Sequence, residues 1–484
     1  MSNLSDLLPA GASAKSITAT DSGSGITSGK PVILETAGTV TQVATVSASD
    51  VGTPVVFESA TTQYLSATFD SSSNKVVIAY QDYGNSAYGT AVVGTVSGTA
   101  ISFGTPVVFE SAETRDISAI FDSNSNKVVI AYEDRGNSNY GTAIVGTVSG
   151  TAISYGTPVV FESAESDYIS ATFDSDSNKV VIAYRVYPTD YGKAIVGTVS
   201  GTAISFGTAV VFESAAVAYM SATFDSNENK VVISYQDYGN SSYGTAIVGT
   251  VSGTDISFGT AVVFESAGTY NIAATFDSNS NKAVFAYRDN GNSDYGTGIV
   301  GTVSGTAISF GTPVVFETAW VNYVSATFDS DSNKVVIAYA DEGNSNYGTV
   351  IQGTVSGTAI SYGATVVYES ANAQWNSATF DSNSNKVVIA YADGGNSDYG
   401  TGVVYSTSTT NLTATNFLGI ADETISSSAS GVIVVQGGTS AKLTSLTIGS
   451  KYYVQNDATI TTVSSTVSAG LAISATSLLL SGDS

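Results

Sequence analysis

Residues 117–162 read ISAIFDSNSNKVVIAYEDRGNSNYGTAIVGTVSGTAISYGTPVVFE, and this stretch decides the fold. We expect four short strands in it, namely ISAIF (117–121), KVVIAY (127–132), YGTAIVGTV (140–148) and TPVVFE (157–162). The Val, Ile, Tyr and Phe runs are typical of strands, and the Gly, Asn, Asp and Ser clusters between them are typical of turns. No segment has the period of a helix. The stretch therefore predicts a unit of four short strands.

The unit is repeated along the chain. Each copy carries a Phe-Asp-Ser sequence, whose phenylalanines are Phe69, Phe121, Phe173, Phe224, Phe276, Phe328 and Phe380. Successive phenylalanines lie 52 residues apart, except for one interval of 51, where RVYPTDYG (185–192) replaces nine-residue loops such as EDRGNSNYG (133–141). Seven copies of a four-stranded unit predict an all-β chain that folds as a seven-bladed β-propeller.

The phase of the repeats predicts how the ring closes. The array opens with a strand-four motif, TPVVFE (53–58), and ends on strand three, YGTGVVYST (399–407). The last blade must therefore take its outer strand from the N-terminal side, which leaves no open sheet edge. An open β-solenoid is the alternative, but its coils are usually shorter than 52 residues. We expect a propeller at 53–407, and we expect 1–52 and 408–484 to form a small bipartite β module for attachment.

Composition excludes several kinds of function. With 41 acidic and 16 basic residues the net charge is −25, which disfavours binding to the phosphate backbone of nucleic acid. The chain has no Cys and no His, which excludes disulfides, thiolate zinc sites and Ser-His-Asp triads. It has neither a long apolar run nor the features of a secretory signal. We expect no nucleic-acid partner, no membrane insertion and no cofactor.

Two turns barely change between copies, namely the turn after strand one, as at DSNSN (122–126), and the turn after strand three, as at SGTAIS (149–154). Both are expected on one face of the propeller. The turn after strand one has the spacing of the start of a calcium loop, as at Asp122, Asn124 and Asn126, but the later Gly and Glu of such a loop are missing. We favour an Asx turn, in which the Asp side chain holds the backbone, and expect no metal; calcium is the alternative. The repeated Glu58 is interpreted as structural, and the repeated Asp82 as a cap of loop amides.

Variation is concentrated on the opposite face. The connections from strand four to strand one read TTQY, ETRD, ESDY, AVAY, GTYN, WVNY and NAQW, and the loops between strands two and three also differ. Copies that are otherwise nearly identical need no such diversity for folding, so we favour ligand recognition over neutral drift. The candidate ligand-binding residues are Trp320, Tyr323, Trp375, Tyr64, Arg115, Tyr168, Arg185, Tyr187, Tyr219, Tyr270 and Arg288.

The repeat distantly resembles the sialidase type of propeller, whose turn has the pattern S-x-D-x-G-x-T-W. The segment from Ser97 to Phe103 keeps the Ser and an aromatic residue but lacks the Asp and the Gly. A sialidase site also needs three arginines on one carboxylate, whereas Arg115, Arg185 and Arg288 belong to different repeats and no matching Tyr–Glu pair is evident. We therefore expect no catalytic residues and no enzyme, with a polysaccharide-degrading enzyme as an alternative.

The chain more closely resembles structural proteins of tailed bacteriophages. The resemblance is carried by the opening MSNLSDLLPAG, by the repeat SNKVVIAYxDxGNSxYGTAIVGTVSGTAISFG, and by LTIGSKYYVQNDATITT and LAISATSLLL near the C-terminus. It implies a virion component of the tail-fibre, adhesin or capsid-decoration type. The expected partners are other virion proteins and a host-surface polysaccharide, with several copies or a homo-oligomer on the particle. The other alternative is a purely architectural protein without a specific ligand.

Overall fold

The computed structural model describes residues 16–23, 25–35, 38–43, 45–47, 49–407, 409–410, 412, 416–454, 458–462 and 467–481. The opening MSNLSDLLPAG, which carries part of the phage resemblance, lies outside the described residues. The chain divides into two compact units, residues 50–407 and residues 1–49 with 408–484. The described residues contain no α-helix, and none of their helical turns is long or apolar enough to cross a membrane.

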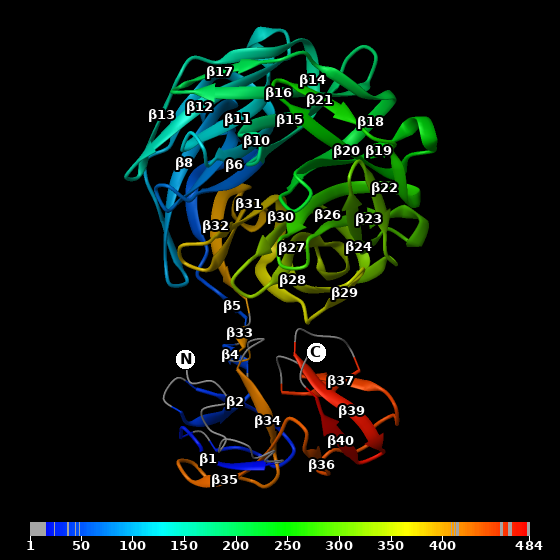
Figure 1. Cartoon of the computed structure of the whole chain (residues 1–484). Coiled ribbons are helices and arrows are strands. Elements are labelled where there is room, and N and C mark those ends of the chain that lie inside the picture. The colour runs from blue at the N-terminus through cyan, green and yellow to red at the C-terminus, as the bar shows by residue number, and fades with distance from the viewer. Residues whose placement is uncertain are drawn as a thin grey trace. The chain divides into compact units, whose positions relative to one another are not determined.

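Seven long strands organise residues 50–407. They are β6 (Val55–Asp70), β10 (Val107–Asp122), β14 (Val159–Asp174), β18 (Val210–Asp225), β22 (Val262–Asp277), β26 (Val314–Asp329) and β30 (Val366–Asp381). Each is followed by a middle strand, namely β7 (Lys75–Asp82), β11 (Lys127–Asp134), β15 (Lys179–Val186), β19 (Lys230–Asp237), β23 (Lys282–Asp289), β27 (Lys334–Asp341) and β31 (Lys386–Asp393). In Figure 1 the repeats follow one another around a ring, from β6 in blue to β32 in orange.

The rest of each of the first six repeats is a hairpin, and the last repeat has only the longer strand. The longer strands are β8 (Tyr88–Ser97), β12 (Tyr140–Ser149), β16 (Tyr191–Ser200), β20 (Tyr243–Ser252), β24 (Tyr295–Ser304), β28 (Tyr347–Ser356) and β32 (Tyr399–Ser406). The shorter strands are β9 (Ala100–Phe103), β13 (Ala152–Tyr155), β17 (Ala203–Phe206), β21 (Asp255–Phe258), β25 (Ala307–Phe310) and β29 (Ala359–Tyr362). Single 3₁₀ turns precede six of the longer strands, namely η1 (Tyr83–Asn85), η2 (Arg135–Asn137), η3 (Tyr238–Asn240), η4 (Asn290–Asn292), η5 (Glu342–Asn344) and η6 (Gly394–Asn396).

The long strands correct the expected path between repeats. The first half of β6 pairs with β32 of the last repeat, and its second half, from Thr62 onward, pairs with β7. The other six long strands also pair first with one repeat and then with the next. The expectation of two separate strands, strand four and strand one, joined by a connection is therefore wrong. Neighbours on both edges satisfy the backbone hydrogen bonds, so the chain crosses between repeats as one strand.

The outer edge of each blade is also built from two segments. In the second repeat, one half of β12 pairs with β13 (Ala152–Tyr155), and the other half pairs with the start of β14. The turn predicted at SGTAIS (149–154) thus contains a short strand, and the strand predicted at 157–162 begins at Val159.

The ring closes through the N-terminal strands, as expected. Strand β32 pairs with the beginning of β6 and with β5 (Asp50–Val51). The strands of residues 50–407 consequently form one continuous sequence of pairings that returns to its starting point. The all-β propeller fold predicted from the repeat is confirmed, together with its closure by an N-terminal strand.

Buried polar pairs hold neighbouring repeats together. The Tyr80 side chain is fully buried, and its hydroxyl donates to Glu58 Oε2 at 3.2 Å. Glu58 lies on the part of β6 that pairs with the last repeat, so this hydrogen bond spans two repeats. Each repeat has an equivalent bond, and burial raises the pKa of Glu58. The structural interpretation of these glutamates is supported by this geometry.

The invariant turns have the geometry expected of Asx turns. Asp122 Oδ1 accepts hydrogen bonds from the backbone N–H groups of Asn124 and Ser125, both at 2.9 Å. The same two bonds recur at Asp70, Asp174, Asp225, Asp277, Asp329 and Asp381. Among the described residues, no group of three or more acidic side chains is arranged to hold a metal ion. The Asx-turn prediction is confirmed.

Strands from both flanks share a sheet in the second unit. Its order is β1 (Ser16–Thr20), β35 (Ser430–Val435), β34 (Phe417–Ala421), β2 (Pro31–Leu34) and β3 (Val40–Gln42). A second sheet has the order β36 (Thr439–Ser440), β40 (Ser477–Leu480), β39 (Ser468–Ser474), β37 (Lys451–Val454) and β38 (Ile460–Thr461), and β4 (Thr45–Ser47) pairs with β33 (Thr409–Thr410). One hydrophobic cluster joins the two sheets, as Ile33 and Leu478 show.

Candidate functional site

Every long strand carries a bulge at its middle. In β6 the pairing with β7 skips from Gln63 to Ser66, and the same interruption recurs in the other six long strands. The first skipped residue has a φ angle between 46° and 54°; these residues are Tyr64, Asp116, Tyr168, Tyr219, Asn271, Tyr323 and Trp375. This left-handed backbone costs a non-glycine residue about 1–2 kcal/mol. None of the seven is glycine, although glycine would remove that cost.

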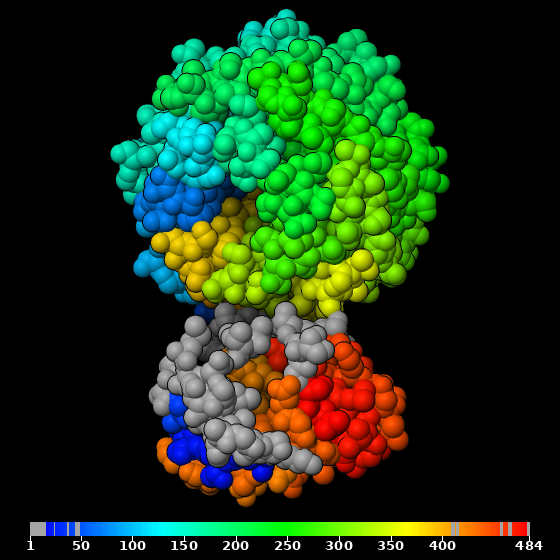
Figure 2. Space-filling model, in the orientation of Figure 1, coloured from blue at the N-terminus to red at the C-terminus, as the bar shows by residue number. Residues whose placement is uncertain are grey.

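The seven bulges open into one cavity of about 770 Å³, which we call the axial cavity. Its lining includes all seven positive-φ residues and the residue after each of them, namely Leu65, Ile117, Ile169, Met220, Ile272, Val324 and Asn376. One face of the ring is shown in Figure 2, where its centre is hollowed. Each repeat thus contributes one variable side chain and, in six repeats, one apolar side chain to the same cavity.

Aromatic side chains from three consecutive repeats line one side of the cavity. The Trp375 ring centroid lies 4.4 Å from that of Tyr64 and 5.3 Å from that of Tyr323. We call these three residues the aromatic arc. Trp375 is half-buried and packs against the core of the first repeat, and this packing holds its ring in place. The arc presents a preordered apolar surface of the kind that stacks on flat or ring-shaped ligands.

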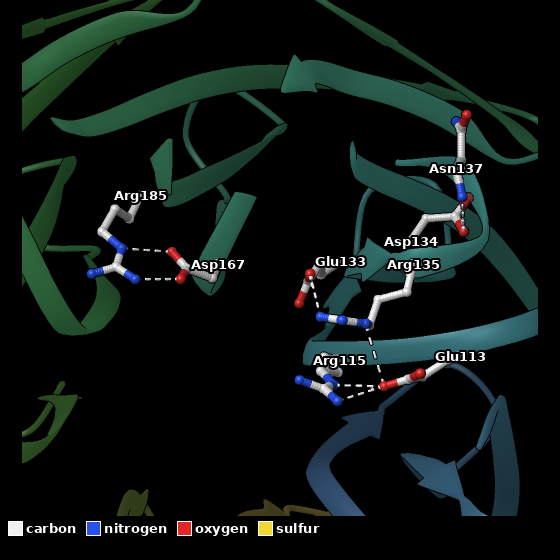
Figure 3. A network of polar contacts seen from close by, with 8 residues as sticks. All are labelled: Glu113, Arg115, Glu133, Asp134, Arg135, Asn137, Asp167 and Arg185. Carbon is white, nitrogen blue, oxygen red and sulfur yellow. Dashed lines mark hydrogen bonds and ion pairs between the residues drawn. The ribbon is translucent and has the colours of Figure 1, made fainter. Parts of the chain in front are cut away.

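Charged side chains of the second and third repeats gather at another side, where Arg115, Glu133, Arg135 and Asp167 line the cavity and Glu113 and Arg185 bind them from outside its lining. Glu113 Oε1 accepts from Arg115 Nε at 2.8 Å and lies 3.3 Å from Arg135 Nε, and Arg135 Nη1 donates to Glu133 Oε1 at 3.3 Å. In the third repeat, Arg185 donates two hydrogen bonds to the carboxylate of Asp167. Figure 3 shows both groups. We call Glu113, Arg115, Glu133, Arg135, Asp167, Arg185 and the neighbouring Asp116 the charged sector.

Two carboxylates of the charged sector have strongly perturbed pKa values. Burial inside the cavity, together with the charge of Asp167, raises the pKa of Asp116 to about 7. Burial and the charge of Asp116 raise the pKa of Glu133 to about 7, although Arg135 opposes the shift. Both side chains therefore titrate near neutral pH, which is unusual for carboxylates outside functional sites.

Arg288 belongs to the fifth repeat and is held by stacking and by hydrogen bonds. Its guanidinium carbon lies 4.7 Å from the ring centroid of Tyr270 and 5.5 Å from that of Trp320. Its Nη1 donates to Asn322 Oδ1 at 2.7 Å, and its Nε lies 3.5 Å from Asp294 Oδ1. The arginine is thus fixed in place before any ligand binds.

The structure gathers most of the predicted binding residues but not all of them. Those that line the axial cavity are Tyr64, Arg115, Tyr168, Tyr219, Arg288, Tyr323 and Trp375. Trp320, Arg185, Tyr187 and Tyr270 lie outside its lining. Trp320 pairs in register with Tyr295 of the preceding repeat and is 48% exposed. The two tryptophans therefore do not meet in the cavity, because Trp320 comes before the bulge and Trp375 lies in it.

Sequence reasoning missed several cavity residues, chiefly Asp116, Glu133, Asp167 and Asn376. A signal for Asp116 was present, because it occupies the same column of the aligned repeats as Tyr64 and Trp375. Asn376 is the one exception in a column of Leu, Ile, Met and Val. The prediction weighted tryptophan, tyrosine and arginine, whereas the shared backbone position was the better guide.

The chain matches no known protein-family model and no curated protein. Among solved structures, a lectin from Burkholderia pseudomallei superposes with a TM-score of 0.53 at 14% identity, covering 74% of this chain and 99% of the lectin. A protein of unknown function from Dyadobacter fermentans superposes with a TM-score of 0.48 at 11% identity, over 75% of this chain and all of that one. A leech intramolecular trans-sialidase reaches 0.45 at 9% identity, over 72% of this chain and 68% of the enzyme. The lectin match supports the propeller fold.

Proposed function

We propose that this protein binds a saccharide of a host-cell surface in the axial cavity, as a non-enzymatic component of a bacteriophage virion. The observation that carries the binding part is the ring of bulges. Seven residues keep bulky or polar side chains at a backbone position that favours glycine, and all seven side chains line one cavity. Non-glycine residues in a strained backbone conformation cluster at ligand-binding sites.

The chemistry of the cavity suits a sugar. Saccharide rings have apolar faces that stack on aromatic side chains, and their hydroxyl groups need fixed donors and acceptors around the edge. The aromatic arc supplies the first, and the charged sector with Asn271 and Asn322 supplies the second. A volume of about 770 Å³ is within the range of pockets that bury small ligands.

The virion part of the proposal rests on the resemblance of the repeat and of the C-terminal segments to tailed-phage structural proteins. In this setting the second unit, in which strands of both chain ends share a sheet, would attach the propeller to other virion proteins. A host-surface polysaccharide would then meet the variable residues of the cavity. The protein would be present in several copies on the particle.

Hydrolysis of the bound saccharide is a second candidate. It is favoured by Asp116 and Glu133, whose pKa values of about 7 would allow one carboxyl group to donate a proton at neutral pH. Release of shortened saccharides by the wild type, abolished in Asp116→Asn, would favour hydrolysis over binding alone.

The test compares two tryptophan variants for binding to glycan arrays and to purified surface polysaccharide. Trp375→Ala should weaken binding by about thirtyfold, because it removes a ring from the aromatic arc at a cost of roughly 2 kcal/mol. Trp320→Ala is the matched control and should change affinity by less than about threefold. Trp320 lies outside the cavity lining, and Arg288, on which it stacks, stays held by Tyr270, Asn322 and Asp294. Trp375→Leu keeps apolar packing and tests binding if the alanine variant is unstable. Normal binding by both Trp375 variants would favour an architectural protein without a specific ligand.

A further inference from the structure

The arginines of the axial cavity are already neutralised by the protein. Arg115 and Arg135 share Glu113, whose Oε1 lies 2.6 Å from Arg115 Nη2 and 3.3 Å from Arg135 Nε. Arg288 is held by Asp294 and Asn322. An anionic ligand would have to displace a carboxylate from one of these arginines before it could bind there. The cavity is therefore poorly suited to sugars that carry a carboxylate or a sulfate.

Two carboxylates in the cavity lining remain without a cationic partner. Asp116 and Glu165 make no ion pair within the part of the chain that the structure describes. Asp116 accepts the backbone N–H of Tyr168, and the charged groups that interact with it include Asp167, Arg185, Arg115 and Glu133. A ligand cation placed at Asp116 would thus supply the partner that the protein does not.

The aromatic arc reaches the same place. Tyr64 and Asp116 occupy equivalent bulges of the neighbouring strands β6 and β10, and both line the cavity, so the end of the arc adjoins the charged sector. An ammonium group in this corner would lie close both to a carboxylate and to an aromatic ring, and each attracts a cation. The rest of the ligand would extend along Trp375 and Tyr323.

Asn376 provides an independent sign that the cavity is built for a ligand. It lines the cavity beside Trp375, and only 8% of it is exposed. Its Oδ1 accepts from the Tyr368 hydroxyl at 2.8 Å, whereas its Nδ2 has no hydrogen-bond partner among the described residues. Buried amide donors are seldom left unpaired, because the lost hydrogen bond destabilises the fold. A hydroxyl or carbonyl oxygen of a bound sugar would satisfy this donor after a rotation of the Asn376 side chain that turns its buried Nδ2 toward the cavity.

We propose that the axial cavity selects saccharides that carry a free, protonated amine, with the ammonium group at Asp116, the sugar ring against the aromatic arc, and a ring oxygen or hydroxyl at Asn376 Nδ2. This inference rests on the proposed saccharide-binding function and specifies its ligand class. It also predicts exclusion of acidic sugars, in keeping with the net charge of −25.

The experiment measures binding of a β-1,4-linked glucosamine trisaccharide, its fully N-acetylated counterpart and sialyllactose to wild type and Asp116→Asn. Calorimetry is done at about pH 7.5, where a carboxyl group with a pKa of about 7 is mostly ionised. The wild type should bind the free-amine trisaccharide at least about fivefold more tightly than the acetylated one, and sialyllactose least of all. Asp116→Asn should reduce the ratio to within about twofold, because it keeps the acceptor but removes the charge. Asp176→Asn, which changes an exposed turn carboxylate, is the control and should keep the full ratio.

The possible results separate this inference from the proposed function. Equal or weaker binding of the free-amine sugar, or an unchanged ratio in Asp116→Asn, would overturn the amine selectivity while other glycans on an array still bind. Equal affinity for choline chloride and the trisaccharide would overturn the role of the sugar ring. No binding of any glycan on the array would overturn the proposed function itself.

Discussion

Two sets of seven residues share the same backbone conformation but differ in their side chains. The turns after strand one place an asparagine at φ of 54–56°, as at Asn74 and Asn229, and all seven repeats use asparagine there. The bulges place Tyr, Asp, Asn or Trp at φ of 46–54°. Asparagine tolerates this conformation well, whereas tyrosine and tryptophan do not.

The difference shows which positions are set by the fold. In the turn, the side chain that matters is the preceding aspartate, which holds two backbone amides in every repeat. In the bulge, the pairing of the long strand on both sides fixes the backbone, so the side chain is free to vary. Residues that are the same in every repeat, such as the turn asparagines, are therefore explained by the fold. Residues that vary at a strained backbone position, such as those of the bulges, indicate the candidate binding site.

The largest expected effect on stability comes from breaking a turn. Asp277 is buried, and its Oδ1 accepts the backbone N–H groups of Asn279 and Ser280 at 2.9 Å. Asp277→Ala should lower the free energy of unfolding by about 2–3 kcal/mol, because both amides lose a charged acceptor. The bulge variant Asn271→Ala should lower it by less than about 1 kcal/mol. Denaturant titrations measure both, and equal losses would contradict the distinction between turn and bulge.

The pH dependence of stability tests the charged bulge residue. The pKa of Asp116 is raised to about 7, so the folded protein binds a proton that the unfolded chain has lost above pH 4. Stability from this group is therefore full below about pH 4 and declines as the pH rises to about 7. Asp116→Asn should raise the melting temperature at pH 8 but not at pH 4, corresponding to roughly 1–2 kcal/mol.

The exposed Asp176→Asn serves as the control for this pH profile and should give the same small change at both pH values. A wild-type profile that Asp116→Asn leaves unaltered between pH 4 and pH 8 would show that the carboxyl group of Asp116 titrates normally.

A glycine comparison measures the strain in the two regions. At Tyr219 the φ angle is 49° and at Asn229 it is 54°. In both places the glycine variant should be more stable than the alanine variant by about 1 kcal/mol, because only alanine keeps the left-handed penalty. Thermal unfolding of the four variants gives these differences, and glycan binding should be affected only by the changes at Tyr219. A glycine variant no more stable than its alanine partner would argue against strain at that position.

The smallest effect concerns the strand that follows the bulge. Ser170 Oγ accepts the backbone N–H of Ala222 in the next repeat, and six such hydroxyl contacts occur in residues 50–407. The fifth repeat has Ala273 at this position. Ala273→Ser should stabilise the protein by about 0.5–1 kcal/mol by completing the set, and Ser170→Ala should destabilise it by a similar amount. A destabilising Ala273→Ser would show that this interface has no room for the hydroxyl.

The sequence by itself determined the all-β class, the repeat, the closure of the ring and the Asx turns. These features depend on local patterns, such as the strand-forming run KVVIAY (127–132) and the turn at Asp122, or on the phase of the repeat, which comparison within one chain makes visible. The concentration of variable residues around one site was also visible in that comparison, as the cavity residues Tyr64 and Trp375 show.

Only the tertiary structure decided which contacts those variable residues make. Whether the long strand passes between repeats without a loop depends on hydrogen bonds to two strands that are distant in sequence, as β6 shows. The separation of Trp320 from Trp375 depends on the side of the bulge on which each residue lies. The same holds for the pairing of Arg115 with Glu113, while Asp116 forms no ion pair with any described residue. At the bulge, adjacent residues such as Tyr64 and Leu65 both line the cavity, because the left-handed backbone interrupts the alternation of side chains that a regular strand would have.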